Sequence, residues 1–514
     1  MASPPPASQP VSQPVSQPVW DRSIADLQAG MASGELTSEK LVQLYLRRIS
    51  RMDRRGPTLH AVIAVNPAAL ADARALDQER RARGPRGPLH GIPVLIKDNV
   101  ETADPMPTTA GSLALAGNLT LRDAFLVARL RAAGAVVIGK ANLSEWANHR
   151  STRSISGWSA IGGLVRNPHV LDRSACGSSA GSAVGVAAGF AAAAVGTETD
   201  GSIVCPSAMD GVVGLKPTLG LVSRSRVIPI AHSQDTAGPI GRTVTDVAVL
   251  LQVMAGSDPA DPATVDADAH RQDYAAALRP DALRGKRIGV LRFEPGRHPE
   301  IDAPFADALA VLREAGATLV EVDLPDPAPL GRAERQVLES EFRADLDAYL
   351  ATMPASVGSR TLADLTAFNA AHPDELVWFG QDVFERTAKA PPPEGPEYLA
   401  ALAEAKRLSG PEGIDRMLAA DRLDAIVAPT TGLAWRIDTV AGDHFPGSFS
   451  SLPAVAGYPH LTVPMGFIRD LPLGISFIGP AWSEPTLLSM GYAFEQRTHA
   501  RRPPRFLKGE PGED

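Results

Sequence analysis

The sequence predicts an α/β protein in which one large, mixed and mostly parallel β-sheet is covered by helices on both faces. Two observations predict this class. Short apolar runs alternate with helical segments from Trp20 onward, and their spacing fits strand–helix–strand units. The composition agrees, because 44 % hydrophobic and 21 % charged residues are typical of a globular protein. Because no clear linker interrupts residues 22–502, we expect one large domain over 20–502.

The first third of the chain gives the clearest elements. Leu41, Tyr45 and Ile49 recur at helical spacing after a capping Thr37 or Ser38. Further predicted elements are a strand at 61–65, a helix at 67–83, a strand at 92–96, a helix at 123–133 that stops at Gly134, and a strand at 136–138.

The segment 176–222 differs from the rest, because small residues are unusually dense in it. We expect a helix of small side chains over 183–195, which would let neighbouring backbone approach closely. The remaining predictions are strands at 287–291, 318–322 and 423–427, a helix at 302–315 and several helices to about residue 418.

Both ends of the chain read as irregular. Residues 1–19 contain three copies of Ser-Gln-Pro-Val and are predicted to be a disordered lead, and residues 503–514 a loose tail. The lead lacks the basic start and apolar core of a signal peptide. We expect a soluble protein, cytoplasmic by default and periplasmic if a signal segment preceded this lead.

Charge, hydropathy and cysteine content exclude several classes. Fifty basic and 58 acidic residues give a net charge of −8, which argues against a general nucleic-acid binder. No run of about 18 apolar residues predicts a membrane span. Cys176 and Cys205 form no CxxC pair, so neither a zinc site nor a disulfide framework is expected. Two free thiols are favoured over one disulfide between them.

Two glycine-rich segments could carry serine chemistry. They are Gly177-Ser178-Ser179-Ala180-Gly181 and Asp200-Gly201-Ser202-Ile203. A nucleophilic serine needs a base for its proton and backbone N–H groups for the oxyanion, and glycines let backbone approach substrate. A plain glycine-rich turn that opens a helix is the structural alternative for each. The first segment also fits G-x-S-x-G with Ser179 at its centre, but that motif must follow a buried strand, whereas 167–174 reads as loop.

These segments resemble the amidase signature family. The resemblance rests on ordered motifs at family spacing and runs from about residue 22 to 502. The motifs begin with Gly91-Ile92-Pro93-Val94-Leu95-Ile96-Lys97-Asp98, Gly139-Lys140-Ala141-Asn142-Leu143-Ser144-Glu145 and Gly177-Ser178-Ser179-Ala180-Gly181-Ser182-Ala183. They continue with Gly196-Thr197-Glu198-Thr199-Asp200-Gly201-Ser202-Ile203 and Gly214-Leu215-Lys216-Pro217-Thr218.

The resemblance implies a catalytic triad and an amidase signature fold. It implies that Ser202 is the nucleophile, that Ser178 is a bridging serine after a cis peptide bond, and that Lys97 is the base. The two serines are 24 residues apart, as in the family. Ser179 would support the network by hydrogen bonding. The implied oxyanion hole consists of the backbone N–H groups of Thr199, Asp200, Gly201 and Ser202.

A lysine acts as a base only when it is neutral, so burial must lower its pKa from about 10.4. Lys97 follows the apolar run 92–96, which should place it at the carboxyl end of a buried strand, where α/β sheets bind ligands. If the resemblance to the family is set aside, Lys97 would ordinarily be interpreted as a surface lysine at the end of a strand. Lys140 and Lys216 have similar surroundings, and residue patterns alone do not choose among the three. A histidine-based triad is the rival mechanism, but no histidine spacing favours one.

Within the family, the sequence is most similar to bacterial peptide amidases. The similarity lies in residues 142–148, 154–160 and 200–206, and in the C-terminal segments 445–447, 456–459 and 481–485. Many family members have Gly where Asp200 stands and Arg where Val204 stands. The resemblance implies hydrolysis of the C-terminal carboxamide of peptides with release of ammonia. Trp146 and Asn148 are the candidates for lining the amide end of the pocket, although packing roles are as plausible.

Three interpretations follow. The first is a peptide amidase. The second is a broader hydrolase of the same family that acts on anilides, urethanes, esters or aliphatic amides, because acyl-enzyme chemistry alone does not discriminate them. The third is the amidase subunit of a tRNA-dependent amidotransferase, which the insert at 260–420 and Val204 disfavour. No cofactor or metal site is expected. The expected partner is a small amide or short amidated peptide, and the chain is expected to be a monomer.

Overall fold

One large sheet organises the protein. A computed structural model describes residues 17–294 and 296–510. The strands of the sheet are β1 (Val62–Val65), β2 (Pro93–Lys97), β3 (Val136–Ala141), β6 (Ala193–Glu198), β7 (Val213–Lys216), β8 (Thr236–Gly241), β9 (Arg287–Val290), β10 (Thr318–Glu321), β11 (Ala425–Pro429), β12 (His460–Ile468) and β13 (Leu471–Ile478). Their order across the sheet is β1-β3-β2-β6-β8-β7-β12-β13-β11-β9-β10. The strands β4 (Trp158–Ser159) and β5 (Gly163–Leu164) form a separate hairpin.

The sheet is mixed, as the sequence predicts, but its centre is antiparallel. In the described part of the chain, β3, β2 and β6 pair in parallel at one side, and β11, β9 and β10 at the other. The pairs from β6 through β8, β7, β12 and β13 to β11 are antiparallel, as is β1 with β3. Parallel pairs are therefore fewer than expected. The alternation of strand and helix in the sequence holds only for the strands at the two sides of the sheet.

Helices cover both faces of the sheet. They are α1 (Ile24–Ser33), α2 (Ser38–Met52), α3 (Ala69–Arg83), α4 (Phe125–Ala132), α5 (Ala180–Ala187), α6 (Val204–Met209), α7 (Val244–Met254), α9 (Pro299–Glu314), α15 (Ser451–Ala456) and α16 (Glu484–Thr498). Along β12, Leu461 and Val463 face α16, whereas Thr462 points to the opposite side, toward α6. This alternation places α16 and α6 on opposite faces, which confirms the expected two-sided cover.

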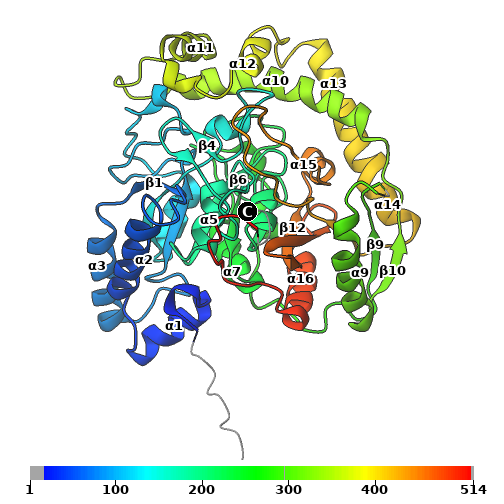
Figure 1. Cartoon of the computed structure of the whole chain (residues 1–514), viewed down its shortest axis with the longest axis horizontal. Helices are drawn as coiled ribbons and strands as arrows, with labels where there is room; N and C mark the ends of the chain where they lie inside the picture. Colours follow the sequence, from blue (N-terminus) through cyan, green and yellow to red (C-terminus); the bar gives the residue numbers. More distant parts are fainter. Residues whose placement is uncertain (1–16, 295, 511–514) are drawn as a thin grey trace, which may run out of the picture.

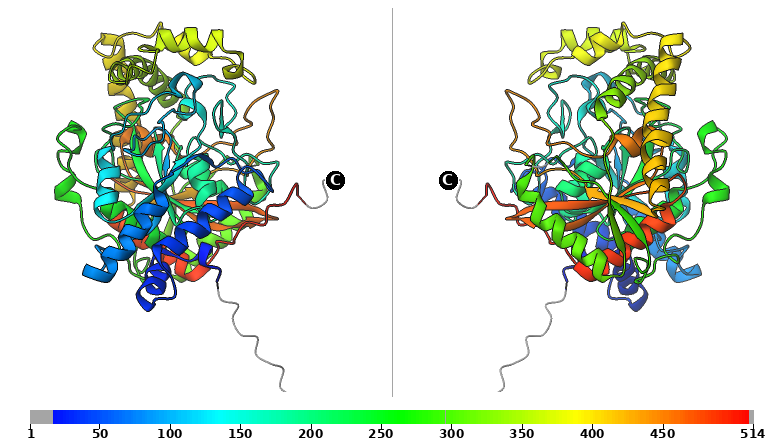
Figure 2. Two further views of the ribbon diagram at one scale, coloured as in Figure 1. Left: turned by 90° about the vertical axis from the view of Figure 1, so that its left-hand side faces the viewer. Right: turned by 90° about the vertical axis from the view of Figure 1, so that its right-hand side faces the viewer.

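A helical insert forms an arch on one side of the sheet. It contains α10 (Pro327–Ala351), α11 (Leu362–Ala371), α12 (Asp382–Thr387), α13 (Pro396–Ser409) and α14 (Asp415–Ala420). The short helix α8 (Ala267–His270) lies outside it, and its His270 stacks on Trp482. Helices α10 to α13 stand apart from the sheet in Figure 1, and the side views of Figure 2 show the same arrangement. Apolar residues of α10 and α11, such as Phe342 and Leu365, pack with Leu115 and Trp146 from the sheet side. The arch therefore closes over the face that carries the site. None of the described helices is long and apolar enough to span a membrane.

The predicted helix at 183–195 is wrong in extent. The structure has α5 at Ala180–Ala187, a turn at Gly189, and then the central strand β6 from Ala193. Gly189 has φ +70°, a left-handed conformation that ends the helix and that glycine adopts without strain. The run of Ala and Val that follows has no periodicity, so a buried strand and a buried helix look alike in it.

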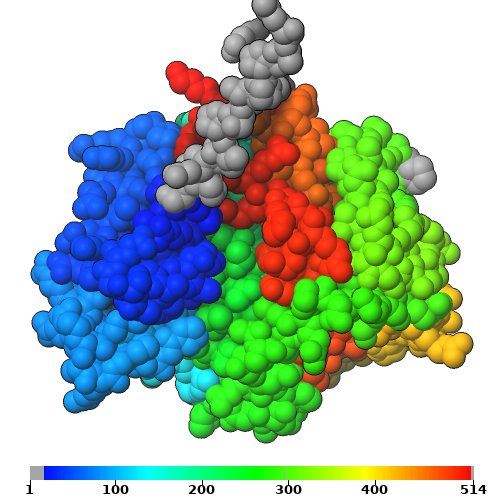
Figure 3. Space-filling view, turned by 90° about the horizontal axis from the view of Figure 1, so that it is seen from below, coloured from blue at the N-terminus to red at the C-terminus, as the bar shows by residue number. Residues whose placement is uncertain are grey.

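The chain ends differ from the loose tail expected at 503–510. Phe506 N donates to Pro168 O (3.0 Å) and Leu171 N donates to Leu507 O (2.7 Å), so this segment is tied to the loop before the serines. Arg501 Nη2 also donates to Asp21 Oδ1 (2.6 Å). The N-terminal and C-terminal parts accordingly meet on the face turned away from the arch (Figure 3). Residues 1–16 of the predicted lead and 511–514 of the tail lie outside the described residues.

Candidate active site

Lys97 occupies the carboxyl end of a central strand. It is the last residue of β2, between β3 and β6, and its side chain is 0 % exposed. Its Nζ donates to Ser178 Oγ (2.8 Å) and to the hydroxyl (2.8 Å) and carbonyl (3.2 Å) of Thr197. Burial lowers the pKa of Lys97 to about 7, although the negative charges of Glu198 and Asp235 oppose that shift. A large fraction of this amine is therefore neutral near pH 7.

The two serine segments lie against each other beside Lys97. A cis peptide bond joins Gly177 to Ser178. Ser179 N donates to Ser202 O (3.0 Å), which holds the loop before α5 against the loop before α6. Ser202 is 8 % exposed and lines a cleft. Within the described residues, no hydrogen bond joins Ser178 Oγ to Ser202 Oγ, so the direct side-chain contact present is that between Lys97 and Ser178.

Ser179 is hydrogen-bonded to Thr197, the residue near the end of β6 that accepts from Lys97. Its Oγ donates to Thr197 O (3.0 Å) and accepts from Thr197 N (3.2 Å). Thr197 Oγ1 also accepts from Asn99 Nδ2 (2.9 Å). Thr197 thus connects the segment 177–181 to Lys97. Sequence reasoning missed this role because threonine at the end of a strand carries no special signal.

The loop at 199–202 presents backbone donors to the cleft. Among the described residues, no acceptor takes the N–H groups of Thr199, Asp200, Gly201 or Ser202. Gly201 has φ +76°, a left-handed conformation that a side chain would strain, and all four residues line the cleft. Glu198 Oε2 accepts from Ile203 N (2.7 Å) and Val204 N (3.1 Å), which satisfies the first donors of α6. The free donors that remain suit a developing negative charge.

The cleft at the serines has a volume of about 550 Å³. Its walls come from segments far apart in the sequence: the loop at 147–156, the two serine segments, α10 through Leu338, and the loop at 443–451. No lysine or arginine lines it, within the part of the chain that the structure describes, whereas Asp200 and Asp443 do. The cleft therefore has room for a ligand larger than a single small amide. Its lining, among the described residues, offers no positively charged side chain to pair with a carboxylate.

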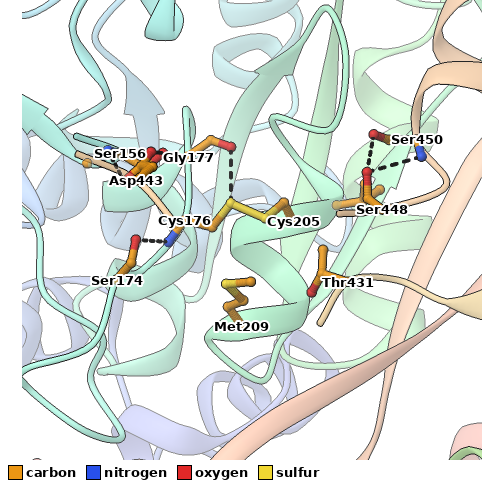
Figure 4. The surroundings of a disulfide bond; sticks show 12 residues. Ser156, Ser174, Cys176, Gly177, Cys205, Met209, Thr431, Asp443, Ser448 and Ser450 are labelled. Atoms are coloured by element: carbon orange, nitrogen blue, oxygen red, sulfur yellow. Dashed lines mark hydrogen bonds between the residues drawn. A yellow bond between two sulfur atoms is a disulfide. The ribbon is translucent and has the colours of Figure 1, made fainter. Parts of the chain in front are cut away.

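A disulfide forms part of one cleft wall, and the expectation of two free thiols is wrong. Cys176 and Cys205 are bonded with a Cα–Cα distance of 6.0 Å. Figure 4 shows the bond beside Gly177, with Ser448 and Ser450 beyond Cys205. Because α5 and α6 begin from adjacent loops, residues 29 apart in the sequence meet in space. Their spacing alone could not reveal this pairing.

Comparisons with known proteins agree with this geometry. The family model described as Amidase matches residues 40–488. The chain belongs to the amidase family. A probable amidase of Arabidopsis thaliana is 40 % identical over 501 residues, covering 95 % of this chain and 92 % of that protein. The native peptide amidase of Stenotrophomonas maltophilia is 55 % identical in sequence, with a TM-score of 0.90, covering 94 % of this chain and 98 % of that one. The resemblance expected from the motifs is thus confirmed.

A further relative is named for a different role. A glutamyl-tRNA(Gln) amidotransferase subunit from Roseiflexus castenholzii is 37 % identical over 496 residues, covering 94 % of this chain and 98 % of that protein. Relatedness over the whole chain therefore establishes an amide-hydrolysing enzyme of this family without fixing its substrate.

The two predicted pocket residues of this amidase separate in the structure. Asn148 lines the cleft. Trp146 does not: it is 2 % exposed and packs edge-on against Phe384, with ring centroids 5.9 Å apart. Residues 146–148 have left-handed backbone conformations, and the turn they form directs the large indole into the apolar cluster under the arch. Trp146 is therefore a packing residue of the cleft wall.

The other lysines of this amidase are engaged elsewhere. Lys140 Nζ donates to Val100 O and to Thr108 Oγ1 (2.8 Å), and Lys216 Nζ donates to Pro217 O (3.0 Å). Neither bonds a serine of the 177–182 or 200–203 segments. The structure thereby separates three lysines that residue patterns left equivalent.

The histidines of this amidase are not placed for a triad. His169 Nε2 donates to Asp210 O (3.1 Å), away from the cleft. His149 lines the cleft, but burial lowers its pKa to about 4 and it packs on Phe342. His232 lies 2.9 Å from Asp345 and, with Glu341, forms the one cluster of possible metal ligands among the described residues. These three groups are already engaged in ion pairs and hydrogen bonds with one another and their neighbours.

Proposed function

We propose that this amidase hydrolyses the C-terminal carboxamide of peptides, releasing ammonia and the free peptide acid. Ser202, Ser178 and Lys97 form the proposed triad. The observation that carries this proposal is the bond from the buried Lys97 Nζ to Ser178 Oγ, beside a serine that faces the cleft. The similarity to a peptide amidase supports the choice of substrate.

The proposed reaction uses one acyl-enzyme. Neutral Lys97 accepts the Ser178 proton while Ser178 accepts that of Ser202, and Ser202 Oγ attacks the amide carbon. The N–H groups of residues 199–202 stabilise the negative oxygen that results. The same relay returns the proton to the amide nitrogen, the C–N bond breaks and ammonia leaves. Water, activated by the same base, then hydrolyses the ester at Ser202.

The charge of the cleft supports a carboxamide over a carboxylate. Bringing an ionised carboxylate into a site without a partner cation is costly, and here it would also approach Asp200 and Asp443. A neutral –CONH₂ group does not meet that cost. We infer that the free peptide acid binds weakly, so that the product leaves readily after each turnover.

The size of the cleft supports a peptide over a simple amide. A volume of about 550 Å³ lies within the range that suits ligands larger than one small amide. Asn148 is the proposed contact for the amide end, because it lines the cleft beside the serines. Short amidated peptides are thus the proposed substrates, and internal peptide bonds are expected to stay intact.

A substrate panel tests the proposal. It contains a C-terminally amidated, N-acetylated dipeptide, the matched dipeptide acid, an anilide and an ester, with ammonia and peptide acid as the measured products. We expect ammonia from the amidated dipeptide and loss of turnover in Ser202→Ala. Ser182→Ala is the matched control, because Ser182 Oγ donates to Val195 O (2.9 Å) rather than to a residue of the proposed triad, and this variant should keep activity.

Other outcomes of the panel would contradict the proposal. Preference for the anilide or ester would move the enzyme to the broader hydrolase interpretation. Turnover only in the presence of partner subunits would favour the amidotransferase interpretation that the Roseiflexus relative represents. Activity that survives Ser202→Ala would refute the triad.

A further inference from the structure

A buried acid of the arch touches the loop that carries Ser202. Glu334 lies on α10, is 8 % exposed, and its Oε1 accepts from Gln234 Nε2 (3.0 Å). Gln234 Nε2 also contacts Thr199 O (3.3 Å). The other side of the same loop is held by Ser451 Oγ, which donates to Asp200 Oδ2 (2.6 Å). Glu334 thus reaches the 199–202 loop from the arch, opposite α15.

The carboxyl groups of Glu334 and Asp200 lie close enough to shift each other's pKa. Asp200 Oδ1 is enclosed and has no ordinary donor as its partner. Two ionised carboxylates are acceptors only, so such a contact requires that one of them carries a proton. Burial and the neighbouring charge of Asp200 raise the pKa of Glu334 to about 8. The pair therefore holds one proton at neutral pH.

We propose that protonated Glu334 is a positioning residue, which donates a hydrogen bond to Asp200 and so holds the 199–202 N–H groups toward the oxyanion. The inference rests on the proposed function of that loop. Asp200 contributes one of the N–H groups through its own backbone, so a shift of its side chain moves a donor directly. An oxyanion donor that is misplaced loses much of its contribution to turnover.

Other charged groups face the pair from every side. Lys216 of β7 and Glu198 of β6 interact electrostatically with Asp200, Asp235 bonds Thr199 Oγ1 (2.6 Å), and on α13 Lys406 bonds Ser233 O (3.0 Å). Burial lowers the pKa of Lys216 to about 8, so its positive charge fades as Glu334 ionises. Above pH 8 the pair then becomes two carboxylates without compensation, and their repulsion should displace the loop.

Glu334→Gln is the decisive variant. A glutamine amide keeps both contacts, because its oxygen accepts from Gln234 and its NH₂ group donates to Asp200, yet it never ionises. In the intact enzyme we expect kcat to fall about tenfold or more between pH 7.5 and 9.5. In Glu334→Gln we expect kcat within about twofold of the parent at pH 7 and no fall at high pH. Glu334→Ala should lower kcat at least about tenfold with little change in KM.

Glu341→Gln is the matched control. Glu341 is a buried acid on the same helix, bonded to Tyr398 Oη (2.7 Å) and Ser233 N (2.9 Å) without touching Asp200. This variant should keep the fall at high pH. If Glu334→Gln keeps that fall as well, the inference is overturned. A Glu334→Ala enzyme that is folded by thermal melting and fully active would also overturn it. Activity of Ser202→Ala would instead refute the proposed function, which separates the two failures.

Discussion

The lowered pKa of Lys97 makes a quantitative prediction for the pH dependence of catalysis. The proposed base must be neutral to accept a proton, and burial lowers the pKa of Lys97 to about 7. Its neutral fraction is then about 9 % at pH 6, about 50 % at pH 7 and about 91 % at pH 8. Below pH 7 the charged form of Lys97 dominates, and a charged amine cannot accept a proton. Activity is therefore lost as the pH falls through 7. We expect kcat/KM to rise about fivefold between pH 6 and 8, because a tenfold gain in neutral Lys97 is halved by the ionisation of Glu334 at pH 8.

The assay needs a substrate that does not titrate in this range. An N-acetylated dipeptide amide meets that condition, and its hydrolysis can be followed by chromatography of the peptide acid from pH 5 to 9. The Lys97→Met variant, which keeps the length of the side chain, should lose about 10²–10⁴-fold in kcat/KM. A midpoint near pH 10, the ordinary value of a lysine, would refute the reasoning. So would a Lys97→Met variant with more than a tenth of the parent activity.

Three further changes test other parts of the structure. Replacing both Cys176 and Cys205 by serine should lower the free energy of unfolding by about 3–4 kcal/mol, the value for a loop closed over a separation of 29 residues, as measured by urea unfolding. Gly181→Ala should lower it by about 3 kcal/mol, because the new methyl carbon would lie 2.3 Å from a backbone oxygen. Thr197→Val, which removes an acceptor of Lys97, should lower kcat about tenfold at unchanged KM.

Two of these changes have a matched control. Gly87→Ala adds a methyl group with nothing within 4 Å and should leave the unfolding free energy unchanged. Thr366→Val removes a hydroxyl on α11 and should leave kcat unchanged. Equal unfolding midpoints of the parent and the double serine variant would contradict the first prediction. Wild-type stability in Gly181→Ala would contradict the second, and wild-type turnover in Thr197→Val the third.

Local patterns in the sequence predict the strand that carries Lys97 and the two serine segments of the candidate site. The apolar run before Lys97 is a central strand, because a run buried on both sides must be apolar throughout. The two serine segments lie against each other, and glycine at 177 and 201 leaves room for the side chains of Ser144 and Ser450. These features lie within short stretches of chain, where residue type alone constrains the backbone.

Contacts between distant segments could not be predicted in the same way. Glu334 and Asp200 meet because the arch folds back over the sheet, and no pattern on α10 marks one acid among several. The disulfide depends on how two helices begin side by side. For Trp146 the sequence leaves a pocket role and a packing role equally plausible. The short left-handed turn at 146–148, which no residue pattern predicts, directs the indole into the apolar cluster. The monomeric state stays a prediction, which sedimentation or light scattering would test.

The helix α10 has a consequence for any attempt to re-engineer this enzyme. Leu338 forms part of the cleft wall, and Glu334, one turn earlier on the same helix, touches the loop of the nucleophile. In the proposed mechanism, α10 therefore carries both a residue of the substrate cleft and a residue that positions the loop of Ser202. Exchanging the insert for that of a relative should therefore alter substrate selectivity and turnover together. The arch cannot be replaced to change selectivity alone. Libraries aimed at new substrates should vary the cleft residues within 443–448 and leave α10 unchanged.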